Sequence, residues 1–250
     1  MPVLFLHSLG LGLSLTSAKL QQTAKLLATA FPSDQYADRL MVGRQEQLGP
    51  GMVYRPGLGG GGDAVDGSLT YGEFDLELFA TLVERAFGSR GPAGRTFVDV
   101  GSGCGRLVLA AAALWPELAC VAGVERQEEL HRMAEAASAA INLPVRPLRR
   151  FVCADAADAL APAGELAAGA SDVLFAYSSS FAGYGDRLTD FSSTCGTVLP
   201  VGARVVTTDK RLADGEFWRF ELLDAIDGAN RETAGSVGYV HEVTRSLRRA

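Results

Sequence analysis

The sequence predicts an α/β fold built on a mostly parallel β-sheet with an antiparallel hairpin near its C-terminal end. Between residues 74 and 208, short apolar runs typical of buried parallel strands alternate with helical runs. A glycine-rich turn follows the first of these strands, and two strand-like runs joined by a polar turn end the chain. With 250 residues, 48% of them apolar, the chain can bury a full core, which excludes a disordered or fibrous protein.

Composition divides the chain into three segments. We predict an N-terminal extension over residues 1–48, a glycine-rich loop over 49–69 and an α/β domain over 70–250. Glycine and proline dominate the middle segment, which is typical of a connector and not of packed structure. One domain with an extension therefore accounts for the whole length.

The extension begins with an apolar run from Val3 to Ala18. Small residues end this run, so it could serve as a targeting peptide. No Lys or Arg precedes Lys19, however, and the alternatives are a docking segment or an artefact of the assigned start. A helix is predicted over 17–31, where apolar residues recur at helical spacing, and no periodic pattern continues beyond it.

Within the α/β domain, apolar periodicity assigns the elements one by one. Runs at three- and four-residue steps predict helices, and short apolar runs bounded by glycine or polar residues predict strands. The predicted helices are 74–87, 107–115, 128–141, 156–160 and 186–195. The predicted strands are 96–100, 120–125, 151–154, 173–177, 204–208, 217–226 and 236–244. Such alternation indicates βαβ units whose sheet is covered on both faces.

Charge and cysteine content narrow the function classes. The net charge is −6, so the chain is no polycation, and we expect direct nucleic-acid binding to be weak or absent. The four cysteines show no paired spacing and there are three histidines, so we expect no metal site and interpret the cysteines as core residues in a reducing compartment. No apolar run is long enough to cross a membrane. We expect a nuclear or cytoplasmic protein.

The turn after the first predicted strand carries the strongest indication of a ligand site. Glycines at 101, 103 and 105 let the backbone approach a ligand, and the following helix offers free amides. Arg106 stands where a dinucleotide-binding loop has its third glycine. Asp99 adds a carboxylate that would repel a diphosphate but could hold a cationic amine. The pattern favours a cofactor with an amino-acid end over NAD.

This stretch, Val98-Asp99-Val100-Gly101-Ser102-Gly103-Cys104-Gly105, resembles the first motif of class I S-adenosylmethionine-dependent methyltransferases. The resemblance implies a Rossmann-like seven-stranded sheet and S-adenosyl-L-methionine as cofactor. Glu125 ends the second predicted strand, where an acidic side chain can accept both ribose hydroxyls. Asp155 follows the third strand, where such enzymes contact the adenine, and it could also act as a helix N-cap.

A closer resemblance covers roughly residues 70–245. Tyr71-Gly72-Glu73, the glycine motif, Gly123-Val124-Glu125, the run from Val173 to Ala182 and Tyr239-Val240-His241 are similar to the histone-lysine methyltransferases that lack a SET domain, the disruptor-of-telomeric-silencing family. The resemblance implies that Tyr71 and Glu73 belong to a loop that closes over the methionine end of the cofactor. It also implies that Asp155 and Ala156 bracket the adenine.

The chain departs from this family at the acceptor side. Ser179-Ser180 stands where the family has two asparagines that shape the lysine channel, and a hydroxyl donates fewer hydrogen bonds than an amide. The family also grips nucleosomes through basic segments, and this acidic chain has no comparable tract. Tyr177, Ser179, Ser180 and Phe181 follow the fourth parallel strand, where the acceptor would approach, and we predict them as the catalytic residues; Tyr184 is a weaker candidate.

These inferences predict an S-adenosylmethionine-dependent methyltransferase that acts on a protein lysine, with histones in nucleosomes as the partner that the resemblance implies. The alternatives are methyl transfer to a small molecule or a non-histone protein, and a cofactor-binding module without catalysis. The residues predicted to bind the cofactor are Tyr71, Glu73, Asp99, Gly101, Ser102, Gly103, Gly105, Glu125, Asp155 and Ala156.

Overall fold

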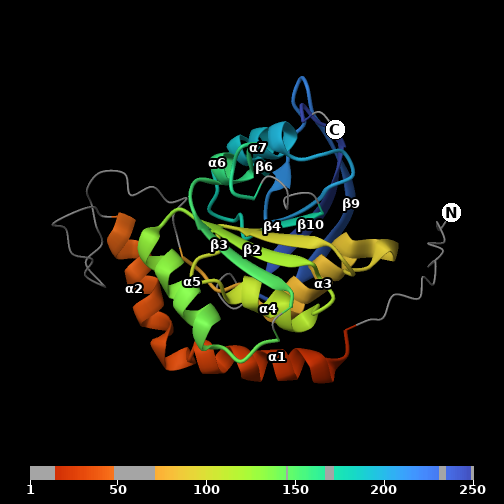
Figure 1. Ribbon diagram of the computed structural model, residues 1–250. Coiled ribbons are helices and arrows are strands. Elements are labelled where there is room, and N and C mark those ends of the chain that lie inside the picture. Colours follow the sequence, from red (N-terminus) through yellow and green to blue (C-terminus); the bar gives the residue numbers. More distant parts are fainter. Residues whose placement is uncertain (1–14, 48–70, 145, 167–171, 231–234, 249–250) are drawn as a thin grey trace.

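A seven-stranded sheet is the centre of the computed structural model (Figure 1), which describes residues 15–47, 71–144, 146–166, 172–230 and 235–248. The strands lie in the order β3-β2-β1-β4-β7-β10-β9. All neighbours from β3 to β7 are parallel, whereas β10 runs antiparallel to both β7 and β9. The predicted α/β class with a C-terminal antiparallel hairpin is confirmed. The seven strands are β1 (Thr96–Val100), β2 (Cys120–Glu125), β3 (Leu148–Cys153), β4 (Val173–Ala176), β7 (Arg204–Thr208), β9 (Arg219–Gly228) and β10 (Ser236–Arg245).

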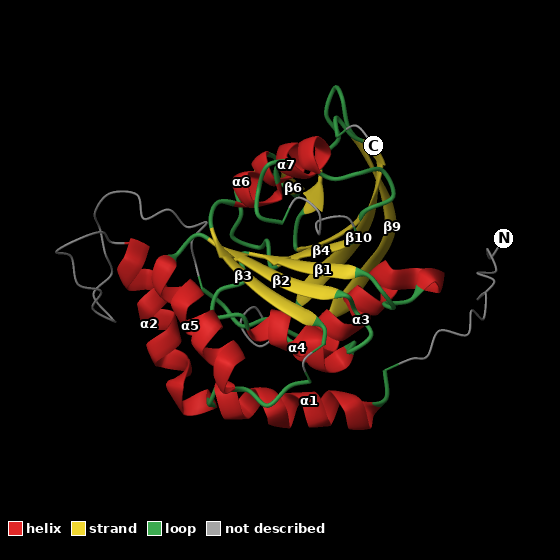
Figure 2. Ribbon diagram, in the orientation of Figure 1, coloured by secondary structure: helices red, strands yellow, loops and turns green. Residues whose placement is uncertain are grey.

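Helices cover both faces of the sheet, as Figure 2 shows. One face carries α3 (Leu76–Phe87), α4 (Arg106–Leu114) and α5 (Glu128–Ala140), and the other carries α6 (Ala156–Leu160) and α7 (Asp190–Val198). Each face has its own buried apolar cluster, because alternate residues of the central strands point to opposite sides. Within β1, Phe97 belongs to one cluster, and Val98 and Val100 to the other. This two-sided burial explains the continuous apolar strand sequences.

The N-terminal extension forms two helices that pack on the α/β unit. Helix α1 (Ser17–Ala30) contacts α4, and α2 (Tyr36–Gln47) contacts α5 (Figure 1). A short 3-10 turn, Ser33–Gln35, separates them. Helix α1 matches its prediction, whereas α2 forms where no element was predicted. The sequence of α2 is polar and weakly periodic, so packing against the rest of the fold stabilises it. The glycine-rich loop and most of the apolar N-terminal run lie outside the described residues.

The region between β4 and β7 differs from the prediction. The helix expected from residue 186 begins at Asp190, because residues 187–188 form strand β6. This strand joins β5 (Gly183–Tyr184) and β8 (Arg211–Leu212) in a separate three-stranded sheet. Earlier in the chain, a 3-10 turn, η3 (Gly88–Arg90), follows α3. No helix within the described ranges is long and apolar enough to span a membrane.

The cysteine prediction is correct for two of the four residues. Cys104 and Cys195 are buried, whereas Cys120 is half-buried and Cys153 is exposed. The exposure of Cys153 follows from its place at the end of β3, which is the edge strand of the sheet.

Candidate functional site

A cavity of about 290 Å³ lies over the carboxyl ends of β1 to β4. In open parallel sheets this edge is where ligands bind, next to the point where the strand order reverses. Here β1 is that point, because β2 lies on one side of it and β4 on the other. Twelve of the predicted site residues line the cavity: Tyr71, Glu73, Asp99, Gly101, Ser102, Gly103, Glu125, Asp155, Ala156, Tyr177, Ser180 and Phe181. Gly105 and Ser179 do not.

The glycine turn between β1 and α4 forms the floor of the cavity. Gly101, Gly103 and Gly105 have φ values of 75°, 53° and 82°, which residues with a Cβ rarely adopt. A Cβ at Gly103 would lie 2.8 Å from the Tyr71 ring. Gly105 faces Phe151 instead, so its role is to let α4 pack closely on the sheet.

Glu125 holds the glycine turn in place from the end of β2. Its Oε2 accepts a hydrogen bond from the Gly103 amide at 2.8 Å, and its Oε1 accepts one from the Gln127 amide at 2.9 Å. The side chain is buried, so these charge-assisted bonds act in a low-dielectric environment. The contact of Glu125 with ribose hydroxyls stays a prediction.

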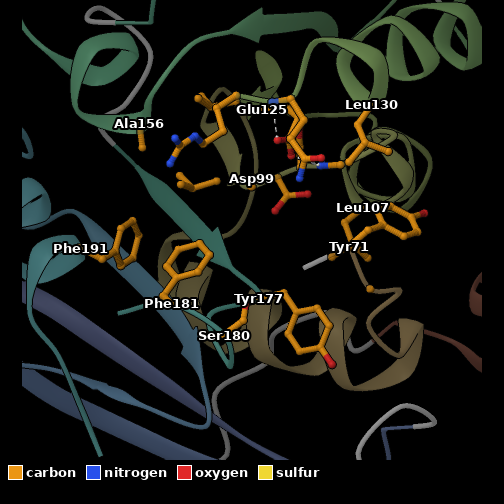
Figure 3. A pocket seen from close by; sticks show the side chains of 18 of the residues that line it. Tyr71, Asp99, Leu107, Glu125, Leu130, Ala156, Tyr177, Ser180, Phe181 and Phe191 are labelled. Atoms are coloured by element: carbon orange, nitrogen blue, oxygen red, sulfur yellow. Dashed lines mark hydrogen bonds between the residues drawn. The ribbon is translucent and has the colours of Figure 1, made fainter. Parts of the chain in front are cut away.

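Asp99 is a buried carboxyl group that projects into the cavity (Figure 3). Within the part of the chain that the structure describes, it forms no hydrogen bond or ion pair. Burial, together with the nearby Glu125 carboxylate, raises the pKa of Asp99 to about 8. Such a group is uncharged near neutral pH and gains its charge when a cation comes close. The cavity therefore offers a binding position for a cationic amine.

Two aromatic rings enclose the opposite side of the cavity from Tyr71 (Figure 3). Phe181 and Phe191 pack edge to face with their ring centroids 5.5 Å apart. Next to them, Asp155 caps α6 by accepting a hydrogen bond from the Ala157 amide at 2.9 Å. Its side chain is exposed, so the cap leaves room for a second contact. The contact of Asp155 and Ala156 with an adenine stays a prediction.

The predicted acceptor residues separate into two groups. Tyr177, Ser180 and Phe181 line the cavity, and the Tyr177 hydroxyl accepts a hydrogen bond from the Asn230 amide at 3.0 Å. Ser179 is outside the lining, and its hydroxyl donates to the Asp209 carboxylate.

Tyr184, the weaker acceptor candidate, is 87% exposed and does not line the cavity. It lies in β5, the outer strand of the small three-stranded sheet. Its position therefore supports no direct role in the cavity.

Several lining residues were not predicted from the sequence. Asp190, Phe191 and Thr194 reach the cavity from the first turns of α7, and Phe74, Arg126 and Leu130 complete its walls. The α7 residues were missed because the helix was expected to begin four residues earlier. Asn230 is a further addition, from the turn between β9 and β10, and nothing local in that polar turn distinguishes it.

Metal and histidine chemistry find no support at this site. Among the described residues no cluster of three or more histidine, cysteine or acidic side chains could hold a metal ion. His131 lies on α5 beside Glu135, with 3.6 Å between Nε2 and Oε2. His241 is buried in β10, and burial lowers its pKa to about 4. Neither histidine lines the cavity.

Residues 65–145 match the family model described as "Histone methylation protein DOT1". The match spans about a third of the chain and includes the 71–74 loop, the glycine turn and Glu125. It therefore covers the part of the cavity that is formed by the 71–74 loop and the segment from β1 to α5. A comparison with curated proteins found no significant sequence match.

The solved structures that match this chain include several methyltransferases. TrmN from Thermus thermophilus is 20% identical, with a TM-score of 0.48. The match covers 71% of this chain and 51% of the Thermus protein. A methyltransferase from Thiobacillus denitrificans, solved with S-adenosyl-L-homocysteine, is 14% identical, with a TM-score of 0.44 over 69% of this chain and 92% of its own. Ribosomal protein L11 methylase from Lactobacillus delbrueckii subsp. bulgaricus is 17% identical, with a TM-score of 0.41 over 68% of this chain and 78% of its own.

Proposed function

Because the chain has the class I S-adenosylmethionine-dependent methyltransferase fold, we propose that it binds S-adenosyl-L-methionine in this cavity and transfers the methyl group to a protein lysine. The observation that carries the proposal is the buried, unpaired Asp99 carboxyl beside a glycine turn. Asp99 supplies a counter-charge for an amine, and the turn allows close approach of a ligand. The family-model match supports a histone as acceptor, and the lysine rests on the resemblance described in the sequence analysis.

The residues around the cavity fit the three parts of this cofactor. Asp99 would meet the amino group of its methionine end, and Glu125 would accept from the ribose hydroxyls. Asp155, Ala156 and the pair of phenylalanines would surround the adenine, since aromatic faces and edges suit a planar base. The cavity volume of about 290 Å³ lies at the lower limit of small-molecule sites, which begins at about 300 Å³.

The protein's part in the reaction is to position an acceptor and exclude water. The bound cofactor supplies a methyl group that is already activated as a sulfonium. Tyr177 and Ser180 offer hydroxyl groups that can orient an amine, and the Asn230 amide fixes the Tyr177 hydroxyl. Phe181 lines the same region and reduces its access to water. An uncharged amine needs no strong general base, so a lysine that reaches the cavity as an ammonium ion would first lose its proton to water.

The charges around the cavity favour a basic segment of a partner protein. Besides Asp99, which is uncharged near neutral pH, and Glu73, which pairs with Arg39, three acidic residues and two arginines line the cavity: Glu125, Asp155 and Asp190, with Arg106 and Arg126. The excess of negative charge attracts a basic segment. Histone tails are such segments, so nucleosomes and free histones are the first substrates to test.

The test combines binding with transfer of a labelled methyl group. The wild-type chain, Asp99→Asn and the matched control Asp224→Asn are incubated with labelled S-adenosylmethionine and either nucleosomes, free histones or a general protein extract. Asp224 lies in β9, where it pairs with Arg85 at 2.7 Å, and it does not line the cavity. We expect histone label with the wild type and the control, and none with Asp99→Asn.

Other outcomes separate the parts of the proposal. Label in non-histone proteins alone would show that the methyl acceptor is a protein other than a histone. Cofactor binding without any protein label would favour a small-molecule acceptor or a non-catalytic module. No binding of S-adenosylmethionine by the wild type would overturn the proposal as a whole.

A further inference from the structure

Helix α2 packs against Tyr71, a residue of the cavity lining, although the helix lies outside the residues that match the family model. Gly43 of α2 faces Tyr71 so closely that a Cβ there would lie 2.8 Å from the Tyr71 Cβ. The rings of Tyr36 and Tyr71 are 6.5 Å apart. Tyr71 is therefore held between α2 on one side and the glycine turn, at Gly103, on the other.

Arg39 is the charged residue at this contact, and it is only 3% exposed. Its Nε donates to Glu73 Oε1 at 2.8 Å, its Nη2 lies 2.7 Å from the same oxygen, and its Nη1 donates to the Pro32 carbonyl at 3.0 Å. The guanidinium also lies over the rings of Phe31 and Tyr36, at 5.9 and 6.0 Å from their centroids. Although burial opposes the charge, the contact with Glu73 outweighs it, and the pKa of Arg39 is raised. Arg39 is thus a buried, permanently charged partner of Glu73.

Glu73 connects Arg39 to the cavity wall. The Tyr71 hydroxyl donates to Glu73 Oε1 at 2.9 Å and lies 2.8 Å from the Cys104 sulfur in the glycine turn. Glu73, Tyr71 and Cys104 all line the cavity, whereas Arg39 does not. A chain of contacts therefore runs from α2 through the 71–73 loop to the glycine turn.

We propose that Arg39 is a positioning residue for the end of the cavity formed by the 71–73 loop, where the methionine part of the cofactor binds. This inference rests on the proposed function. Arg39 holds the Glu73 carboxylate, and Glu73 in turn fixes the Tyr71 hydroxyl against the glycine turn. Without Arg39, the part-buried Glu73 carboxylate would keep only the more distant Arg106, whose Nε lies 3.7 Å from Oε2, and the loop would lose the contact that fixes its position.

The position of the loop predicts a ligand-selective effect. In Figure 3, Tyr71 and Ala156 lie at opposite ends of the cavity, with Asp99 between them. A change at Arg39 should therefore weaken binding of ligands that carry the amino-acid end. It should leave ligands that fill only the nucleoside end unaffected. General loss of structure would weaken both alike, so the comparison separates positioning from stability.

The test measures two ligands by calorimetry, S-adenosylhomocysteine and 5′-methylthioadenosine, which lacks the amino-acid end. For Arg39→Met we expect about a 10- to 100-fold loss of affinity for the first and less than about a twofold change for the second. Arg39→Lys keeps the charge but not the paired donors, and should recover part of the loss. The matched control is Arg95→Met, because Arg95 pairs with Asp172 at 2.9 Å at the amino end of β1, away from the cavity.

A second variant covers the case that Arg39→Met does not fold. Gly43→Ala keeps Arg39, replaces a mid-helix glycine by the best helix former, and brings a methyl group against Tyr71. We expect this variant, too, to bind S-adenosylhomocysteine more weakly while its affinity for 5′-methylthioadenosine stays the same. Unchanged affinity, or an equal loss for both ligands, in the folded variants would overturn the inference while leaving the proposed function intact. A wild-type chain that binds neither ligand would instead contradict the proposed function.

Discussion

Replacing Asp99 by asparagine tests the electrostatics of the cavity through the stability of the ligand-free protein. The pKa of Asp99 is raised from 3.8 to about 8 by burial and by Glu125. Because its pKa is higher in the folded than in the unfolded chain, the folded state binds more protons between these values, and ionisation of Asp99 lowers stability as pH rises. The neutral asparagine has no such dependence.

The size of the effect follows from the shift. Each pH unit between the two pKa values changes the stability contribution of Asp99 by about 1.4 kcal/mol. From pH 6 to pH 8, the advantage of Asp99→Asn over wild type should grow by about 2 kcal/mol, since the slope flattens near the folded-state pKa. For a chain of this length that corresponds to a change of about 4 to 8 °C in the Tm difference.

Thermal unfolding of both chains at pH 6, 7 and 8, without ligand, measures this growth directly. Comparing differences removes the contribution of the titrating groups that do not interact with Asp99. Asp224→Asn, at a site away from the cavity, should show a Tm difference from wild type that does not rise in this way. An Asp99→Asn difference that is the same at pH 6 and pH 8 would refute the raised pKa.

Three further predictions concern other positions. Glu125→Gln should lower the affinity for S-adenosylhomocysteine by about tenfold or more. Glutamine has one acceptor oxygen, so one of the two backbone amides that donate to Glu125 would be left without a partner. An unchanged Kd by calorimetry would contradict this. Gly103→Ala should weaken binding of the same ligand and lower the Tm, because the new Cβ would meet the Tyr71 ring at a positive φ. A wild-type Kd together with a wild-type Tm would contradict this prediction. His241 has a pKa lowered to about 4, so wild type should lose about 3 kcal/mol of stability between pH 6.5 and pH 4 from this residue. The His241→Phe variant should lose about 3 kcal/mol less stability than wild type over the same pH range. Stability–pH profiles that run parallel for the two chains would contradict the lowered pKa of His241.

The sequence predicts the sheet well because the relevant information is local. A buried parallel strand such as 96–100 is a continuous apolar run, and the glycines after it mark the turn whatever the rest of the fold does. The position of Asp99 and Glu125 at strand ends then places them in one cavity, since parallel strands end at the same edge.

Other features depend on contacts between distant segments and could not be predicted. Helix α2 has little apolar periodicity of its own and is stabilised by a part-buried ion pair between Arg39 and Glu73, 34 residues further along the chain. Ser179 was expected beside Ser180 in the cavity, but its hydroxyl bonds to Asp209 at the end of β7. Neighbouring serines in a loop carry no information about which of them faces the ligand.

The most direct test of the account is calorimetric titration of the wild-type chain with S-adenosylmethionine at pH 7 and pH 8, followed by labelling of nucleosomes with the same sample. Binding that tightens as Asp99 ionises, together with labelled histone, is the predicted result. Absence of binding at both pH 7 and pH 8 would contradict the central claim that this cavity is an S-adenosylmethionine site.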